Sequence, residues 1–100
     1  MAKQNTSVKE RTRTNLQEPH DYVVIFHNDD FTTYDFVVKV LKVVFRKSES
    51  EAVKLTVQVD TEGQAIVGHY SYDIAVTKTN KAIQMARAEN FPLKITYEQA

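Results

Sequence analysis

From residue 22 onward the chain alternates short apolar segments with polar breaks, and each segment has a recognisable period. Residues 22–27 are β-branched and aromatic, which predicts a strand with apolar residues on both faces. Thr32 or Thr33 then caps a helix, because Thr32 and Asp35 have the spacing at which two side chains satisfy the free N–H groups of a first helical turn. The apolar positions of this helix follow at helical spacing: Val37, Val40, Leu41, Val44 and Phe45.

A second helix is predicted after Ser48, because Ser48 and Glu51 repeat the capping spacing. Its inward stripe follows the i, i+3, i+4, i+7 pattern and consists of Ala52, Leu55, Thr56 and Val59. Thr56 is therefore predicted on the buried face although it is polar. Gly63 ends the turn after this helix.

The remaining segments predict a strand, a helix and a last strand. Residues 64–70 read as a strand with Ala65, Val67 and His69 on one face and Ile66, Gly68 and Tyr70 on the other. Ser71 caps a third helix, whose apolar face consists of Ile74, Ala75, Ala82, Ile83 and Ala86. After Asn90 and Pro92, alternation of Leu93, Ile95 and Tyr97 predicts the last strand. The order βααβαβ predicts an α+β fold, with a small three-stranded antiparallel sheet packed on three helices.

Residues 1–20 differ from the rest because they are polar and aperiodic. We expect a flexible N-terminal arm over 1–20 and one folded domain over 21–100, with Pro19 near the boundary. The 100 residues are 42% hydrophobic, and 13 basic residues balance 13 acidic ones. This balance argues against a nucleic-acid binder, which usually carries a basic excess. Without Cys, disulfides and thiolate metal sites are excluded.

No apolar run approaches the roughly 20 residues of a membrane span, and the N-terminus lacks the apolar centre of a secretory signal. We expect a cytoplasmic monomer with no cofactor and no membrane contact. No arrangement of Ser, His and Asp announces a nucleophile, and no pair of His has metal-ligand spacing. Two glycines are too few for a phosphate-binding loop, so an enzyme is not expected.

The candidate chemistry lies at Asn28, Asp29 and Asp30, between the first strand and the first helix. Asx residues favour turns, so a plain turn is one interpretation. The other is a cation site, because Asp60 at the end of the second helix comes near Asp29 if the two helices are neighbours. Paired carboxylates beside an amide oxygen favour an ammonium or a metal ion. Tyr34, in the first helical turn, is placed to wall the mouth of a pocket.

The same residues resemble the ClpS family of protease adaptors. The likeness begins with Tyr-Val-Val-Ile at residues 22–25 and Asn-Asp-Asp-Phe-Thr at 28–32, and continues with Asp-Phe-Val-Val at 35–38 and Val-Leu at 40–41. It continues through Glu-Ala at 51–52, Gly-Gln-Ala at 63–65, Gly68, Ile-Ala at 74–75, Thr-Lys at 77–78, Ala-Arg at 86–87 and Pro-Leu at 92–93. It covers about residues 22–98.

The resemblance implies an adaptor, not an enzyme. Such adaptors bind proteins whose first residue is bulky and hydrophobic, called N-degron substrates, and deliver them to a Clp AAA+ unfoldase of the ClpA or ClpC type. Asn28 and Asp29 would bind the substrate's α-ammonium. Residues of the pocket and its mouth would be Asp30, Thr32, Tyr34, Val37, Thr56, Val59 and Leu93.

The chain departs from the family pattern at four positions. Asp60 stands where the family usually has His, and Tyr34 and Thr56 stand where Met is common. We expect Asp60 to strengthen the preference for a charged N-terminus, and the two carboxylates to raise the pKa of one of them. Tyr34 and Thr56 are expected to alter the ranking of Leu, Phe, Tyr and Trp. Val76, beside Thr77 and Lys78, stands where the family often has Glu, in the region that the family resemblance implicates in docking to the unfoldase. We therefore expect Val76 and Lys78 to be docking residues.

Two other interpretations remain at this stage. A small metal-binding or hydrolytic protein would use Asp29, Asp30 and Asp60. A ribosome-associated α/β module would have a comparable order of elements, although zero net charge argues against RNA contact.

Overall fold

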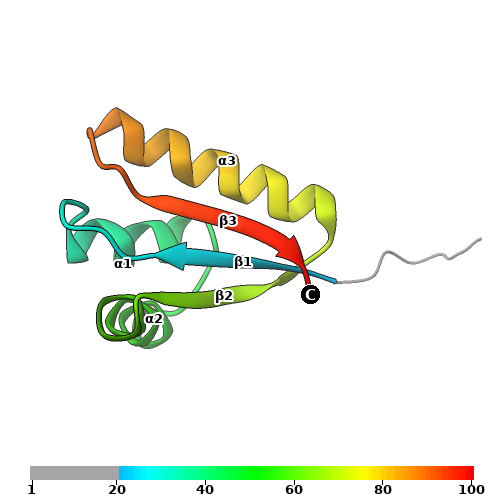
Figure 1. Ribbon diagram of the computed structural model, residues 1–100, viewed down its shortest axis with the longest axis horizontal. Helices are drawn as coiled ribbons and strands as arrows, with labels where there is room; N and C mark the ends of the chain where they lie inside the picture. Colours follow the sequence, from blue (N-terminus) through cyan, green and yellow to red (C-terminus); the bar gives the residue numbers. More distant parts are fainter. Residues whose placement is uncertain (1–20) are drawn as a thin grey trace, which may run out of the picture.

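A computed structural model describes residues 21–100, and it confirms the predicted α+β class and the order βααβαβ (Figure 1). The elements are β1 Tyr22–His27, α1 Tyr34–Val43, α2 Glu49–Glu62, β2 Gln64–Tyr70, α3 Tyr72–Ala88 and β3 Lys94–Gln99. The predicted arm over residues 1–20 lies outside the described residues. No helix of the described part is long and apolar enough to cross a membrane.

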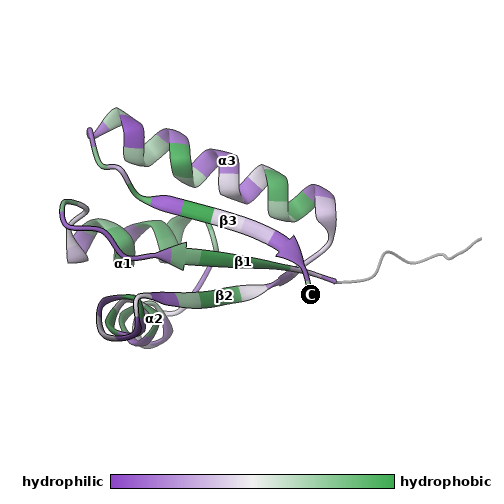
Figure 2. Ribbon diagram, in the orientation of Figure 1, coloured by the Kyte–Doolittle hydropathy of each residue, from purple (hydrophilic) through white to green (hydrophobic). Residues whose placement is uncertain are grey.

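The sheet has the order β2-β1-β3, and both pairs are antiparallel. β1 is central because it is the most apolar strand, and Figure 2 shows it green along most of its length. Val24 and Phe26 belong to the main hydrophobic cluster, which includes residues of all three helices. Val23 and Ile25 lie on the opposite face of the strand and are buried as well.

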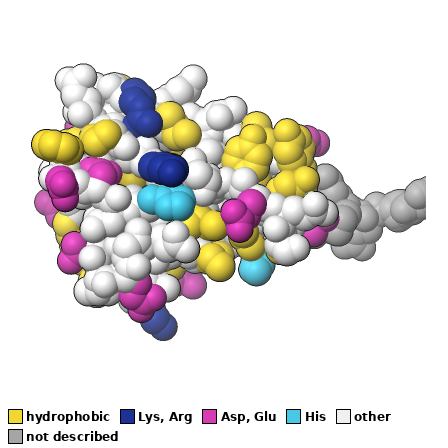
Figure 3. Space-filling model, in the orientation of Figure 1, with side chains coloured by type: hydrophobic (Ala, Val, Ile, Leu, Met, Phe, Trp, Pro, Cys, Tyr) yellow, Lys and Arg dark blue, Asp and Glu magenta, His cyan; other side chains and the backbone are white. Residues whose placement is uncertain are grey.

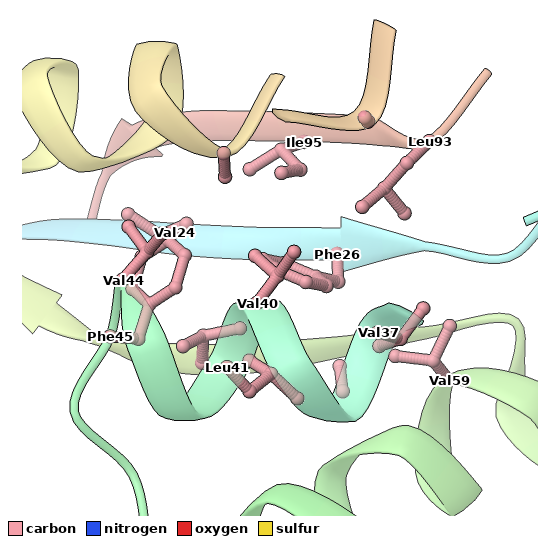
Figure 4. Packing of buried hydrophobic residues seen from close by; sticks show 14 of the residues in the cluster. Val24, Phe26, Val37, Val40, Leu41, Val44, Phe45, Val59, Leu93 and Ile95 are labelled. Atoms are coloured by element: carbon pink, nitrogen blue, oxygen red, sulfur yellow. The ribbon is translucent and has the colours of Figure 1, made fainter. Parts of the chain in front are cut away.

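The main cluster fills the space between the sheet and the helices (Figure 4). The aromatic ring of Phe26 meets that of Phe45 edge-on at 5.5 Å between centroids. Along α3 the buried residues are small: Ala75, Thr79, Ala82 and Ala86. Ile74 was predicted on this face, but it is 45% exposed, because the inward stripe runs through Ala75 and Thr79 instead.

A β-bulge in the pairing of β1 with β2 changes which residues face the core. Val24 pairs with Gly68 and Ile25 pairs with Ile66, so Val67 is the extra residue. Strict alternation predicted His69 on the same face as Val67. His69 is instead exposed, while Tyr70 packs against the core.

Gly68 lies at this bulge, where the ring of Tyr70 comes close to the backbone. A Cβ at position 68 would lie 2.7 Å from the Tyr70 hydroxyl oxygen, so only glycine leaves the ring its place. The Tyr70 ring in turn packs 6.2 Å from that of Phe45.

Local capping defines the helix ends close to the predicted positions. Thr33, not Thr32, caps α1, and its hydroxyl accepts a hydrogen bond from the Phe36 N–H at 3.2 Å. Ser48 caps α2 in the same way. Gly63 ends α2 with φ of +88°, the left-handed conformation that glycine adopts without a Cβ penalty. Ser71 occupies the N-cap position of α3 but its side chain makes no capping bond.

The loop after β1, the start of α1 and the α2–β2 turn lie at the same end of the molecule (Figure 1). The Asn28 backbone N–H donates to the Gly63 carbonyl at 2.9 Å, which joins the end of β1 to the end of α2. This bond brings the Asn28–Asp30 segment beside the last turns of α2.

Candidate functional site

A cavity of about 200 Å³ opens where the loop after β1 meets α1 and α2. It is lined by Asn28, Asp29, Thr32, Tyr34, Val37, Thr56, Val59 and Asp60. All eight residues are among those singled out from the sequence. The structure thus brings the three predicted ammonium-binding residues and five of the seven predicted pocket residues together around one space.

The mouth of the cavity is polar and its interior is apolar. Asn28 and Asp60 are exposed and Asp29 is half-buried, so the polar groups lie toward solvent. Val37 and Val59 are 6% and 5% exposed, and Figure 4 shows them facing each other from α1 and α2 beside the end of β1. Tyr34, the first residue of α1, is 49% exposed. This gradient suits a ligand with a charged end and an apolar end.

Asp29 organises the loop through three hydrogen bonds. Its Oδ1 accepts from the backbone N–H groups of Phe31 at 2.8 Å and Thr32 at 2.7 Å, and its Oδ2 accepts from the Thr32 hydroxyl at 2.8 Å. An ionised carboxylate has about four acceptor sites. Three are therefore used inside the loop, and the remaining one lies on Oδ2.

The same contacts determine the charge state of Asp29. Burial by itself would raise the pKa of this carboxyl. The hydrogen bonds from Thr32 and Phe31, with the positive charge of Arg87, outweigh burial and lower the pKa below its ordinary value of 3.8. The expectation of a raised pKa is thus wrong for Asp29, which stays ionised at neutral pH.

Two predicted pocket residues do not line the cavity. Asp30 is exposed on the loop, and no part of it reaches the cavity wall. Leu93 is 1% exposed and belongs to the main hydrophobic cluster, at the same end of the core as Val37 and Val59 (Figure 4). Leu93 therefore belongs to the core near the cavity and not to its wall.

The predicted docking residues Val76 and Lys78 lie elsewhere, on α3, from which Lys78 reaches the C-terminal end of α1. The Lys78 ammonium donates to the Val44 carbonyl at 2.8 Å, and burial together with the charges of Arg46 and Lys81 lowers its pKa. An open groove of about 250 Å³ is lined here by Val43, Val44, Arg46, Thr77, Lys78 and Lys81. Val76 precedes the groove residue Thr77 in the sequence. Its side chain is half-buried and does not line the groove.

Sequence reasoning missed the roles of Arg87 and of the Gly63 carbonyl. The Arg87 guanidinium donates to the carbonyls of Phe91 at 2.8 Å and Leu93 at 3.1 Å, and its charge also acts on Asp29. The two hydrogen bonds of Arg87 are local, but its effect on Asp29 and the bond from Asn28 to the Gly63 carbonyl join segments distant in sequence, so no local pattern signals them. The likeness of Ala-Arg at 86–87 to the family was the one available sign.

The described residues give little support to a metal site or to an RNA-binding surface. Within residues 21–100, no group of three or more His, Asp or Glu side chains could hold a metal ion, so Asp29, Asp30 and Asp60 do not form such a group. On the face of the described domain seen in Figure 3, acidic and basic side chains are interspersed, without a continuous basic surface. The zero net charge of the chain has the same implication.

Comparison with known proteins gives one consistent answer. Residues 17–96 match the family described as ATP-dependent Clp protease adaptor protein ClpS. The ATP-dependent Clp protease adapter protein ClpS of Nautilia profundicola is 47% identical over 81 residues, covering 81% of this chain and 84% of the relative. That of Treponema denticola is 50% identical over 82 residues, covering 82% and 81%.

A solved structure shows the same fold. It is the structure of Agrobacterium tumefaciens ClpS2 bound to L-phenylalaninamide, which superposes with a TM-score of 0.77 at 38% identity and covers 79% of this chain and 95% of its own. These relatives are named as adaptors and not as enzymes, in agreement with the expectation from the sequence.

Proposed function

The chain belongs to the ClpS family of ATP-dependent Clp protease adaptors, and from this premise we propose that it binds proteins through a bulky hydrophobic first residue and delivers them to a Clp unfoldase. One observation carries the proposal. The cavity combines two carboxylates and an amide at its mouth with a buried apolar interior. A free N-terminus followed by a large apolar side chain presents the complementary groups in the same order.

The mouth is suited to an α-ammonium. This group carries a positive charge and three N–H donors, while Asn28, Asp29 and Asp60 supply acceptor oxygens. Asp29 has one acceptor site left after its loop bonds, and its lowered pKa keeps the charge in place at neutral pH. Hydrogen bonds between charged partners contribute about 1.5–3 kcal/mol each.

The interior is suited to one large side chain. An apolar cavity of about 150 Å³ accommodates benzene, and this cavity measures about 200 Å³. Burying a Leu or Phe side chain contributes about 1.5–3 kcal/mol. Association costs several kcal/mol, so neither the ammonium nor the side chain suffices alone. Both must be present, which is what selection of an N-degron requires.

The ligand of the Agrobacterium tumefaciens relative agrees with this chemistry. L-phenylalaninamide has a free α-amine, a benzyl side chain and an amide in place of the carboxylate. A protein that begins with Phe presents the same three groups. We therefore propose that Asn28, Asp29 and Asp60 hold the ammonium here and that Val37, Val59 and Thr56 surround the side chain.

We further propose that the groove at the end of α1 contacts the unfoldase. The groove carries three positively charged side chains, those of Arg46, Lys78 and Lys81. Val43, which also lines it, is 53% exposed. The groove lies in the region that the family resemblance implicates in docking. Replacing Lys81 with Glu is expected to weaken delivery of a substrate to the protease while leaving peptide affinity unchanged.

Fluorescence anisotropy tests the proposed recognition. A labelled peptide beginning with Phe is expected to bind, whereas the same peptide with an acetylated N-terminus or an initial Gly is not. Equal binding of all three peptides would contradict the proposal, because neither the ammonium nor the first side chain would then be read.

A further inference from the structure

Thr56 gives the apolar part of the cavity a single buried hydroxyl. The residue is 4% exposed and lines the cavity together with Val37 and Val59. Its Oγ1 donates to the Ala52 carbonyl at 2.7 Å, one turn earlier in α2. A hydroxyl has one proton and two acceptor sites, so this bond commits the proton and leaves only acceptor sites unused.

The position of Thr56 relative to Asp60 determines which part of a ligand side chain comes close to Thr56. The two residues are four apart on α2, and a helix rises about 1.5 Å per residue, so they stand about 6 Å apart along the helix axis. Asp60 is exposed at the mouth and Thr56 is buried inside. A side chain that enters past Asp60 therefore brings its far end toward Thr56.

An acceptor at this depth distinguishes tyrosine from phenylalanine. The phenol hydroxyl of a first-residue Tyr lies at the far end of its ring and can donate to Thr56. Against a purely apolar wall, the same hydroxyl would lose its hydrogen bonds to water without replacement, which favours Phe. A site that pairs a buried hydroxyl discriminates more strongly than one that only fits shape.

We propose that Thr56 is a specificity-determining residue that makes this cavity prefer an N-terminal Tyr to an N-terminal Phe, by accepting a hydrogen bond from the phenol. The inference rests on the proposed function, since it concerns the side chain of the same first residue. The inference adds a substrate class to the proposed function, namely proteins whose first residue is Tyr. The family commonly has Met there, which offers no comparable acceptor.

The test compares dissociation constants of peptides that differ only in their first residue. Wild type and Thr56→Val are titrated with Tyr- and Phe-initiated peptides. Val keeps the branched shape and removes the hydroxyl. The ratio of the Phe to the Tyr dissociation constant is expected to fall about threefold to tenfold in Thr56→Val, the value of one net hydrogen bond. An unchanged ratio overturns the inference.

Thr61→Val is the matched control. Thr61 lies on the same helix and its hydroxyl makes the same kind of bond, to the Val57 carbonyl at 3.0 Å, but it is exposed and outside the cavity. Its variant is expected to keep the wild-type ratio, and an equal fall in both variants overturns the inference. Thr56→Ser, which retains a hydroxyl, is expected to restore the preference for Tyr.

A measurement on the wild type alone removes any dependence on variant folding. A peptide beginning with para-fluorophenylalanine has a polar substituent at the same ring position but no donor. It is expected to bind more weakly than the Tyr peptide, and equal or tighter binding overturns the inference. Failure of the proposed function looks different, because the acetylated Phe peptide would then bind as well as the free one.

Discussion

The role of Asp29 is the most direct point at which the proposed recognition can fail. In the Asp29→Asn variant the side chain keeps its shape and loses its charge. The retained carbonyl oxygen can still accept from the N–H groups of Phe31 and Thr32, which now meet Oδ1 at 2.8 and 2.7 Å. The amide NH₂ then takes the place of Oδ2, where the one unused acceptor site lies.

The expected loss of affinity follows from that geometry. The α-ammonium would lose one charge-assisted hydrogen bond worth about 1.5–3 kcal/mol, which corresponds to about tenfold to 100-fold in the dissociation constant. The loop itself changes less. The Thr32 hydroxyl can rotate to accept from the new amide, and two loop bonds persist, so we expect a loss of about 1 kcal/mol in the free energy of unfolding.

Anisotropy with a Phe-initiated peptide measures the affinity, and thermal unfolding followed by circular dichroism measures the stability. Asp30→Asn is the matched control, because Asp30 is the next residue, carries the same charge and does not line the cavity. We expect nearly wild-type binding in the control. Equal losses in both variants would mean that the acidic segment acts only through its general field, and the assignment of Asp29 would be wrong.

Other consequences can be measured with the same peptides. Asp60→Ala is expected to reduce the preference for free over acetylated N-termini several-fold, and equal preferences in variant and wild type would contradict a role for this carboxylate. Tyr34→Met replaces a rigid ring with a pliable thioether at the mouth, and we expect a changed ranking of Leu, Phe, Tyr and Trp; an unchanged ranking would rule out Tyr34 as a gate. Because the pKa of Asp29 is lowered in the folded protein, its contribution to stability is complete above its ordinary value of 3.8 and is lost as the pH falls through the folded value. Peptide binding should therefore be level between about pH 5 and 7, weaken through Asp29 only at a pH below 3.8, and weaken again above about pH 8 as the α-amine deprotonates; a decline already between pH 7 and 5 would contradict the assignment. Thr79→Val removes a buried hydroxyl that has no hydrogen-bond partner among residues 21–100, and we expect a gain of about 1 kcal/mol, seen as a Tm higher by about 4–8 °C.

The order of elements could be predicted from the sequence because local signals define it. Capping residues mark the starts of α1 and α2, and Gly63 marks the end of α2. The errors came where tertiary pairing overrides the local period. The bulge at Val67 depends on how β2 meets β1, and nothing within β2 indicates that His69 and Tyr70 exchange faces.

The candidate site shows the same division. The polar residues that follow β1 are conspicuous because carboxylates there serve no core, and Thr56 falls on an apolar stripe by its spacing. That Asp60 shares their cavity depends on contact between α1 and α2, which the sequence allowed but did not require. The effect of Arg87 on Asp29 is beyond local reasoning, because these two residues are distant in sequence and their charges meet only in the folded chain.

The division of acceptors at the mouth explains why two carboxylates and an amide occur together. Asp29 uses three of its about four acceptor sites for hydrogen bonds within its own loop, and these bonds hold the loop in place without a ligand. One acceptor site is left for the proposed ammonium, which has three donors. Under the proposed recognition, the other two donors require oxygens from elsewhere, and the side chains of Asn28 and Asp60, which line the same cavity, carry such oxygens. An acetylated N-terminus retains one donor and no charge, so it satisfies one acceptor at most and leaves a carboxylate partly desolvated without a partner. Discrimination against acetylation should therefore exceed the loss of a single hydrogen bond, and it should depend on Asp60 as well as on Asp29.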